Sequence, residues 1–203
     1  MNIALIGASG QAGSRILAEL AGRGHHVTAI ARHPDRIAKG PTITARHGDV
    51  VDGDGLAHLL AGHDAVVSAV HFTASDPDIL IATVKAAGVP RYLVVGGAGS
   101  LEVAPGVRLI DTPGFPTAYR AEAARGCDFL DRLRRETDLD WTFLSPSALF
   151  VPGERTGRFR LGTDALLVDG AGTSAISFED YAVAVADELE RPRHSRRRFT
   201  VGY

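Results

Sequence analysis

The stretch Asn2-Ile-Ala-Leu-Ile-Gly7-Ala-Ser-Gly10-Gln-Ala-Gly13 decides how the rest of this chain is interpreted. Its first part, residues 2–6, is short, apolar and rich in residues that suit a buried strand. From residue 14 onward the apolar residues return at the spacing of one helical face, at Ile16, Leu17, Leu20 and Ala21. A strand therefore passes into a helix through a glycine turn, the arrangement in which backbone N–H groups approach a pyrophosphate.

Each glycine of this turn has a separate expected role. Gly7 permits the tight turn, Gly10 removes a Cβ from the path of a phosphate, and Gly13 lets the helix pack closely on the strand. The spacing G-x-x-G-x-x-G differs from the G-x-G-x-x-G of the common dinucleotide fingerprint, and the alternative is a purely structural turn. The position between strand and helix favours nucleotide binding. The residues predicted to contact the cofactor here are Gly7, Ser9, Gly10, Gln11, Ala12 and Gly13.

The composition is that of a globular protein with one domain. The chain has 203 residues, of which 45% are hydrophobic and 23% charged, enough apolar material for a sizeable core. Its net charge of -2 argues against a general nucleic-acid binder. We expect residues 1–203 to form a single domain whose partner is a small-molecule substrate, acting as a monomer or homodimer.

Several other kinds of site are not expected. Cys127 is the only cysteine, and the 8 histidines show no metal-ligand spacing, so we predict no disulfide framework and no metal. No apolar run reaches the length that spans a membrane. Met1 leads directly into strand residues without a basic leader, so the expected location is the cytoplasm, without a membrane or nucleic-acid partner.

The first half of the chain alternates regularly between strand and helix patterns. The expected strands after the first cover residues 26–31, 42–46, 64–69 and 90–95, and the expected helices between them include 53–61 and 77–87. Because such alternation with short links implies parallel strands with helices on both faces, we predict an α/β fold. It is a Rossmann-type, doubly wound parallel sheet in a three-layer αβα arrangement.

The second half changes character. Residues 101–116 are expected to be irregular, followed by a long helix over 119–136 and a sixth strand over 140–144. A capping-box-like start at Ser177 predicts a last helix through Leu189, and a final strand covers 198–201. We expect a small C-terminal substrate cap, built mainly from residues 101–118 and 146–177, to fold over the carboxyl edge of the sheet.

Arg32 follows the second expected strand, at the position that faces the adenosine ribose in a dinucleotide fold. An acidic residue there would favour NAD, whereas a guanidinium suits the 2′-phosphate of NADP. NADP is therefore the predicted cofactor, and the alternative for Arg32 is a solvated charge at a strand end. Asp35 lies close enough in sequence to bend back toward the ribose, so NAD stays open.

Further cofactor contacts are expected where the next strands end. Asp49 is positioned to accept from the adenine amino group while Val50 packs on the ring, although Asp49 as a cap of the following turn is an equal alternative. The nicotinamide half is expected to pass Ser68, Ala69, Val70, His71, Gly96 and Gly97. For His71 the alternative is an ordinary surface histidine after a strand.

Three segments of this sequence resemble a known group of proteins. GASGQAG (7–13), VVGGAGSL (94–101) and WTFLSPSALFVPGERTG (141–157) are similar to the atypical short-chain dehydrogenases, and within them to the NAD(P)H-binding proteins described as NADH-flavin reductases. Flavin/biliverdin-IXβ reductase and the NmrA-like regulators share the glycine loop and the general fold. The resemblance covers essentially the whole chain and implies a Rossmann fold and a nicotinamide cofactor.

One departure from the larger family affects the chemistry. Most short-chain dehydrogenases use Tyr-x-x-x-Lys, in which the lysine lowers the tyrosine pKa for protonation of a carbonyl. Here Tyr119 is followed four residues later by Ala123, so Tyr119 is a candidate catalyst whose alternative is a plain aromatic at a helix start. Ser100 lies where this fold keeps a hydroxyl near substrate, and its alternative is a cap of its own loop.

The missing acid–base pair favours acceptors that need little help from a protein acid. We therefore predict an NAD(P)H-dependent oxidoreductase that transfers a hydride to a flavin, a quinone or another small conjugated acceptor. The alternatives are a non-catalytic NADP-binding regulator of NmrA type and an epimerase acting on a sugar or small carbonyl compound.

Overall fold

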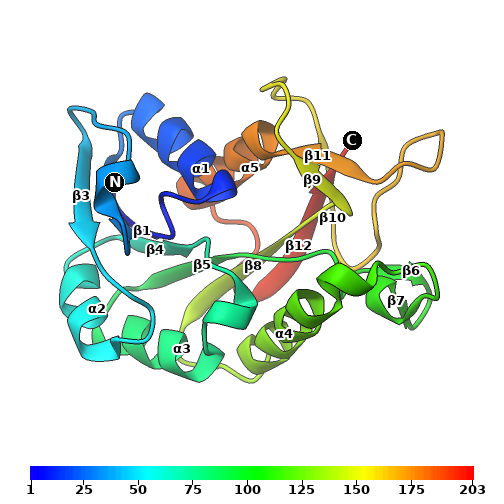
Figure 1. The fold of residues 1–203 in the computed structure, drawn as a ribbon, viewed down its shortest axis with the longest axis horizontal. Helices are drawn as coiled ribbons and strands as arrows, with labels where there is room; N and C mark the ends of the chain where they lie inside the picture. Colours follow the sequence, from blue (N-terminus) through cyan, green and yellow to red (C-terminus); the bar gives the residue numbers. More distant parts are fainter.

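The computed structural model describes all 203 residues and contains a central sheet of eight strands (Figure 1). The strand order is β10-β12-β8-β5-β4-β1-β2-β3, and every neighbouring pair is parallel except β10 with β12. The strands of this sheet are β1 (Asn2–Ile6), β2 (His26–Ala31), β3 (Ile43–His47), β4 (Ala65–Ser68), β5 (Arg91–Val95), β8 (Asp140–Pro146), β10 (Arg160–Gly162) and β12 (Arg197–Gly202). The direction of strand succession reverses between β1 and β4, which is where open α/β sheets bind ligands at the carboxyl ends of their strands.

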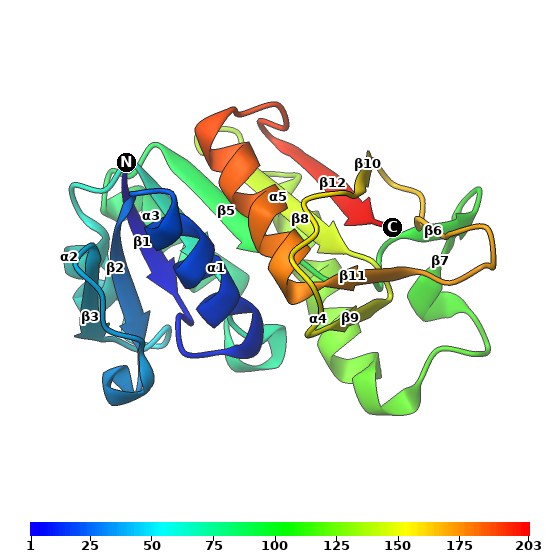
Figure 2. The same ribbon diagram turned by 90° about the horizontal axis from the view of Figure 1, so that it is seen from above.

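Five α-helices cover the two faces of the sheet, as Figures 1 and 2 show. They are α1 (Gln11–Gly22), α2 (Gly53–Leu60), α3 (Pro77–Ala86), α4 (Thr117–Leu133) and α5 (Phe178–Glu190). Helices α1 and α5 lie side by side on one face, and α2, α3 and α4 cover the other. The predicted Rossmann-type, three-layer fold is therefore confirmed.

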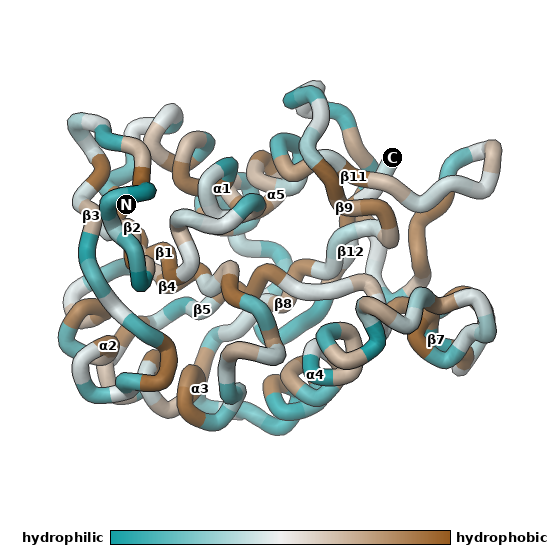
Figure 3. Tube along the Cα trace, in the orientation of Figure 1, coloured by the Kyte–Doolittle hydropathy of each residue, from teal (hydrophilic) through white to brown (hydrophobic).

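The sheet is buried on both faces. One core of 24 buried residues lies between the sheet and α1 with α5, and a second of 19 lies on the side of α2, α3 and α4. This two-sided burial explains why the inner strands appear in the sequence as continuous apolar runs rather than alternating ones. In Figure 3 the hydrophobic colouring follows β1 and β4, while hydrophilic segments mark the outside of α4.

Side-chain caps start several helices, and α1 differs from them. Asp52 accepts from Gly55 N at the start of α2, and Asp76 accepts from Asp78 N and Ile79 N at the start of α3. Ser177 accepts from Asp180 N at 2.9 Å, as its sequence pattern predicts, and begins α5. Helix α1 has no side-chain cap and no acidic residue in its first turn.

The second half of the chain corrects two expectations. Residues 101–116 are not wholly irregular, because they form a hairpin of β6 (Glu102–Ala104) and β7 (Val107–Arg108) and a 3₁₀ turn, Leu109–Asp111. Residues 146–177 contain β10, which pairs antiparallel with β12 and forms the sheet edge instead of lying wholly in a cap. The parts of that segment nearest the carboxyl ends are β9 (Leu149–Val151) and β11 (Ala175–Ser177), which pair in parallel.

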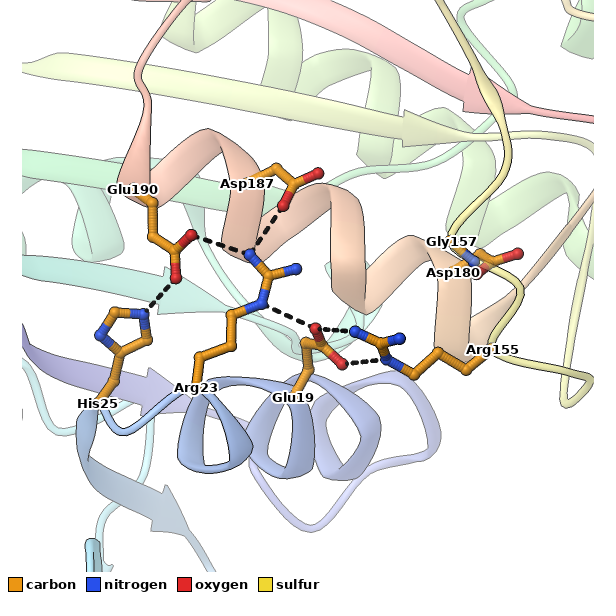
Figure 4. Close-up of polar contacts among 8 residues, drawn as sticks. All are labelled: Glu19, Arg23, His25, Arg155, Gly157, Asp180, Asp187 and Glu190. Carbon is orange, nitrogen blue, oxygen red and sulfur yellow. Dashed lines mark hydrogen bonds and ion pairs between the residues drawn. The ribbon is translucent and has the colours of Figure 1, made fainter.

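Residues 152–158, which we call the strap, dock on α1 and α5 (Figure 4). Arg155 donates to both carboxylate oxygens of Glu19 on α1 at 2.7 and 2.8 Å, and Gly157 N donates to buried Asp180 on α5 at 2.7 Å. The hydrogen bond from Arg155 is the main reason that the pKa of Glu19 lies below its usual value. Arg23, the residue that follows α1, joins this network by bonding Glu19, Asp187 and Glu190, so the carboxyl end of α1 is held to α5.

No helix of the chain has the length and apolar character needed to cross a membrane.

Candidate functional site

The glycine turn after β1 is shaped by close packing at two of its glycines. Gly7 has a φ of +82°, in the left-handed region that favours glycine, and a Cβ there would lie 2.3 Å from the carbonyl oxygen of Ala69. A Cβ on Gly13 would lie 2.1 Å from the carbonyl oxygen of Gly7. The turn is thus held tightly between the ends of β1 and β4 and the first turn of α1, and neither position has room for a side chain.

Gly10 is different, because the protein's own packing leaves room for a side chain there. Its φ of -75° and ψ of 173° are open to any residue. A Cβ on Gly10 would meet Gly7 O at 3.3 Å and Ala69 O at 3.9 Å, with no other atom within 4 Å. The residues around it, Ser9 and Gln11, are exposed. This surface is free for the close approach of a ligand to the backbone.

The amino terminus of α1 presents unpaired donors toward this surface. The backbone N–H groups of Gln11, Ala12 and Gly13 donate to no group in the protein. Unpaired N–H groups and the positive end of the helix dipole together bind phosphate groups. The geometry therefore fits the diphosphate of a dinucleotide, and the contact of these residues with a cofactor stays a prediction.

Two free arginines lie beyond the end of β2. The side chain of Arg32 is exposed and makes no hydrogen bond or ion pair within the chain. Four residues later Arg36 ends the 3₁₀ turn Pro34–Arg36 and is likewise exposed and unpaired. Asp35, between them, pairs with neither. The sequence analysis named Arg32 and not Arg36, and the contact of Arg32 with a cofactor stays a prediction.

The positions of Asp49 and Val50 are compatible with both predicted roles, contact with adenine and capping of the following turn. Asp49 Oδ1 accepts from Val51 N at 3.3 Å, so the turn-capping role is present, while Oδ2 has no partner in the chain. Val50 is half-buried and packs on the core beneath α2 and α3. The contact of these residues with adenine stays a prediction.

The prediction for Ser68 is wrong for its side chain. Ser68 is 2% exposed and its hydroxyl bonds the Tyr92 hydroxyl at 2.9 Å inside the core, where burial raises the pKa of Tyr92 and keeps it a neutral phenol. Strand alternation places the Ser68 side chain, with Tyr92, on the face of the sheet that α2, α3 and α4 cover. The next two residues do adjoin the glycine turn, since Ala69 O and Val70 Cγ1 would lie 2.3 and 3.1 Å from a Cβ on Gly7.

A carboxylate that sequence reasoning missed fixes the loop after β4, residues 69–75. Glu122 on α4 accepts from Phe72 N at 2.7 Å, and from the N and Oγ1 of Thr73 at 2.9 and 2.7 Å. His71 Nδ1 lies 3.4 Å from the same carboxylate. Burial raises the pKa of Glu122, but the hydrogen bonds from Thr73 and Phe72 outweigh it, so the net pKa is lowered. The only sign of Glu122 in the sequence was that an acidic residue stands next to Ala123, the position that the lysine of Tyr-x-x-x-Lys would occupy.

The glycines after β5 serve two purposes. A Cβ on Gly96 would lie 2.4 Å from the Phe143 ring, and a Cβ on Gly99 would lie 2.8 Å from Ala123 Cβ, so both positions are fixed by packing. Gly97 is open, because a Cβ there would meet only the Phe72 ring, at 3.8 Å. Gly97 is therefore the glycine of this loop with space for a ligand.

The two candidate catalysts lie in different surroundings. The Ser100 hydroxyl accepts from a guanidinium nitrogen of Arg198 at 3.3 Å, and Arg198 is itself paired with Asp164. Ser100 thus ties its loop to β12. Tyr119, in the first turn of α4, is 67% exposed, and its hydroxyl has no partner. Whether either residue contacts a substrate stays a prediction.

Taken together, a helix amino terminus with free donors, an open glycine and the strand ends at the switch point define a dinucleotide-binding domain of the Rossmann type. A family model described as NAD(P)H-binding matches residues 7–192. The chain therefore belongs to this NAD(P)H-binding family.

Solved structures from three bacteria are similar to this chain over nearly its full length. A protein from Burkholderia pseudomallei described as a candidate exported protein is 48% identical, with a TM-score of 0.91 and full coverage of both chains. A candidate epimerase from Bacteroides thetaiotaomicron is 44% identical, with a TM-score of 0.95 over 100% of this chain and 96% of that one. A candidate NADH-flavin reductase from Streptococcus pneumoniae is 37% identical, with a TM-score of 0.84 over 100% and 99%.

Proposed function

We propose that this protein is an NADPH-dependent reductase that transfers a hydride to a small conjugated acceptor such as a flavin or a quinone. The observation that carries the proposal is the open Gly10 surface in front of the three unpaired N–H groups of α1. The description of the Streptococcus relative as an NADH-flavin reductase supports the acceptor class.

The residues of the chain would bind and orient the cofactor. The α1 amino terminus would hold the diphosphate, and the free guanidinium groups of Arg32 and Arg36 suit a 2′-phosphate. Ala69, Val70 and Gly97 would border the nicotinamide half at the ends of β4 and β5. When bound, the reduced nicotinamide supplies the hydride, and the protein supplies position and exclusion of water.

The choice of acceptor follows from the Tyr-x-x-x-Lys pair that this chain lacks. Position 123, where the lysine would stand, is occupied by Ala123 in close contact with the loop of Gly99. No cation is therefore placed beside the Tyr119 hydroxyl to activate it as an acid. A flavin or quinone delocalises the charge that arrives with the hydride, whereas a simple ketone requires a strong proton donor.

Steady-state oxidation of NADPH with FMN, menadione and a simple ketone tests this proposal. We expect turnover with FMN or menadione and little with the ketone. If calorimetry detects NADPH binding but no acceptor is reduced, the reductase is refuted. That result would favour the second candidate, a non-catalytic NADP-binding regulator of NmrA type, which the Ser100–Arg198 contact and the unactivated Tyr119 favour.

For the wider setting we propose a small-molecule substrate and no nucleic-acid partner, for a monomer or homodimer in the cytoplasm. The net charge of -2 and the single cysteine support this setting. Cell fractionation tests the location. Recovery of the protein outside the cytoplasm would contradict the proposal, and the Burkholderia relative is described as an exported protein.

A further inference from the structure

The reduced acceptor still needs a proton, and the structure has a histidine–carboxylate pair in the loop after β4. The pair consists of His71, at the end of the β4 loop nearest the sheet, and Glu122 on α4. The loop begins at Ala69, whose carbonyl oxygen is packed on Gly7 of the glycine turn. His71 thus lies two residues beyond the point where the β4 loop meets the glycine turn, at the switch point where this fold binds its ligands.

Glu122 is held firmly, and its charge is maintained. Three donors from Phe72 and Thr73 occupy its two oxygens, and these bonds lower its pKa. The carboxylate is therefore an anion at neutral pH and cannot rotate away without breaking its hydrogen bonds to Phe72 and Thr73. A fixed anion 3.4 Å from Nδ1 favours a proton on that nitrogen and leaves Nε2 as the group that exchanges protons.

The imidazole is free on its other side. The His71 side chain is 85% exposed, and Nε2 has no partner in the chain. The other charged groups around this loop are Asp76, at the start of α3, and Arg125 and Asp128 of α4, which line a small cavity with Phe72 and Thr73. Of these charged groups and Glu122, only Glu122 lies within ion-pair distance of His71.

We propose that His71 is the proton donor of the reduction and that Glu122 is its positioning residue. This inference rests on the proposed reductase function. When bound, the reduced nicotinamide would supply the hydride, which carries two electrons to the acceptor, and would itself be oxidised. The donor is the imidazolium form of His71, which carries a proton on both ring nitrogens. Its Nε2–H bond breaks, the proton forms a new bond to the acceptor heteroatom that has gained negative charge, and the neutral ring keeps its Nδ1 proton beside Glu122. Solvent then returns a proton to the exposed ring.

The pair takes the place of the absent lysine by a different route. Glu122 and Tyr119 are three residues apart on α4, so they are neighbours on the helix surface. A lysine at position 123 would have acted on Tyr119, but that position packs on Gly99. A carboxylate one residue earlier reaches across to the β4 loop and acts on His71 instead.

Single-turnover and steady-state kinetics with NADPH and menadione test the donor role. We expect His71→Gln to lower kcat about 100-fold, the lower end of the range for a positioned acid. NADPH affinity should change less than about twofold, because no cofactor charge is lost. Glu122→Gln should lower kcat by a smaller factor.

Matched controls separate this role from general effects of substitution. His26→Gln changes an exposed histidine at the start of β2, on the opposite edge of the sheet, and Glu154→Gln changes an exposed glutamate of the strap. Both should retain wild-type kcat and its pH dependence. If His71→Gln retains kcat within about twofold at every pH, the donor role is wrong while the reductase stands. If wild-type protein reduces no acceptor, both proposals fall.

A second readout does not depend on activity. The ¹⁵N spectrum of the His71 ring reports which nitrogen carries the proton in the neutral form. We expect the Nδ1–H form in the wild type and in Glu154→Gln, with a shift toward Nε2–H in Glu122→Gln. Unchanged His71 signals in a folded Glu122→Gln protein would show that the pair does not form, and would overturn the inference whatever the kinetics.

Discussion

Replacement of Gly10 by valine separates the binding role of the glycine turn from its structural role. The three glycines of the turn are alike in the sequence, but the structure distinguishes them. A Cβ on Gly13 would lie 2.1 Å from a backbone oxygen, whereas a Cβ on Gly10 would have its nearest contact at 3.3 Å. Gly10 also has backbone angles that valine can adopt. The substitution therefore fills the ligand surface without forcing the fold apart.

The expected magnitudes differ sharply between the two positions. Gly10→Val should cost about 1 kcal/mol in the free energy of unfolding, the size of a changed helix N-cap. Gly13→Ala should cost 3 kcal/mol or more, roughly the upper end for overpacking, because backbone on both sides must move. The valine side chain should remove two charge-assisted hydrogen bonds to the diphosphate, about 1.5–3 kcal/mol each. The Gly10→Val protein should therefore bind NADPH about 10²- to 10⁴-fold more weakly than wild type.

Calorimetric titration with NADPH and denaturant unfolding measure the two effects on the same samples. Gly22→Ala is the control, since a Cβ at Gly22 near the end of α1 meets no atom within 4 Å. It should leave both quantities close to wild type. Binding by a folded Gly10→Val protein within about tenfold of wild type would refute the argument, because the turn would then be structural only.

Three further predictions follow from the site. We expect wild type to prefer NADPH over NADH by about 10- to 100-fold, Arg32→Ala to remove most of this preference and Arg32→Asp to invert it. The test is to measure the dissociation constants of both cofactors for wild type and the two variants. Equal affinities of wild type for NADPH and NADH would count against a role of Arg32. Tyr119→Phe should retain kcat within about tenfold, and a loss of a hundredfold would make Tyr119 the acid. Because the folded-state pKa of Glu122 is lowered, its stabilisation is present above its unfolded pKa of about 4.3 and disappears as pH falls through the folded value. Urea unfolding should therefore find Glu122→Gln less stable than wild type by about 1 kcal/mol at pH 7, with a difference that shrinks as the pH falls below the unfolded pKa, and a difference that stays constant in acid would refute the assignment.

The first hundred residues could be predicted because each element carries its own local signal. Apolar runs, helical spacing and glycine or proline boundaries place β1 to β5 and the helices between them within a few residues. Strand β10 could not be predicted, because Arg160–Gly162 is three residues long, has exposed side chains and exists only through its pairing with β12. The burial of the Ser68 side chain could not be predicted, because β4 is apolar on both faces and its sequence does not show which way each residue points.

The cofactor half and the acceptor half of the site differ in how much the sequence reveals. The cofactor half depends on backbone: glycines without a Cβ and a helix end without a cap, both of which are local and visible in a short motif. The acceptor half depends on side chains that meet across elements. Glu122 is one of several charged residues on α4, and only its contact with a loop fifty residues earlier in the chain separates it from the solvated ones. Helix α4 packs against Gly99 at Ala123 and bonds the β4 loop through Glu122. The proposed acceptor chemistry therefore depends on the packing of one helix against two loops, and variants at Glu122 test it more directly than variants in the glycine motif.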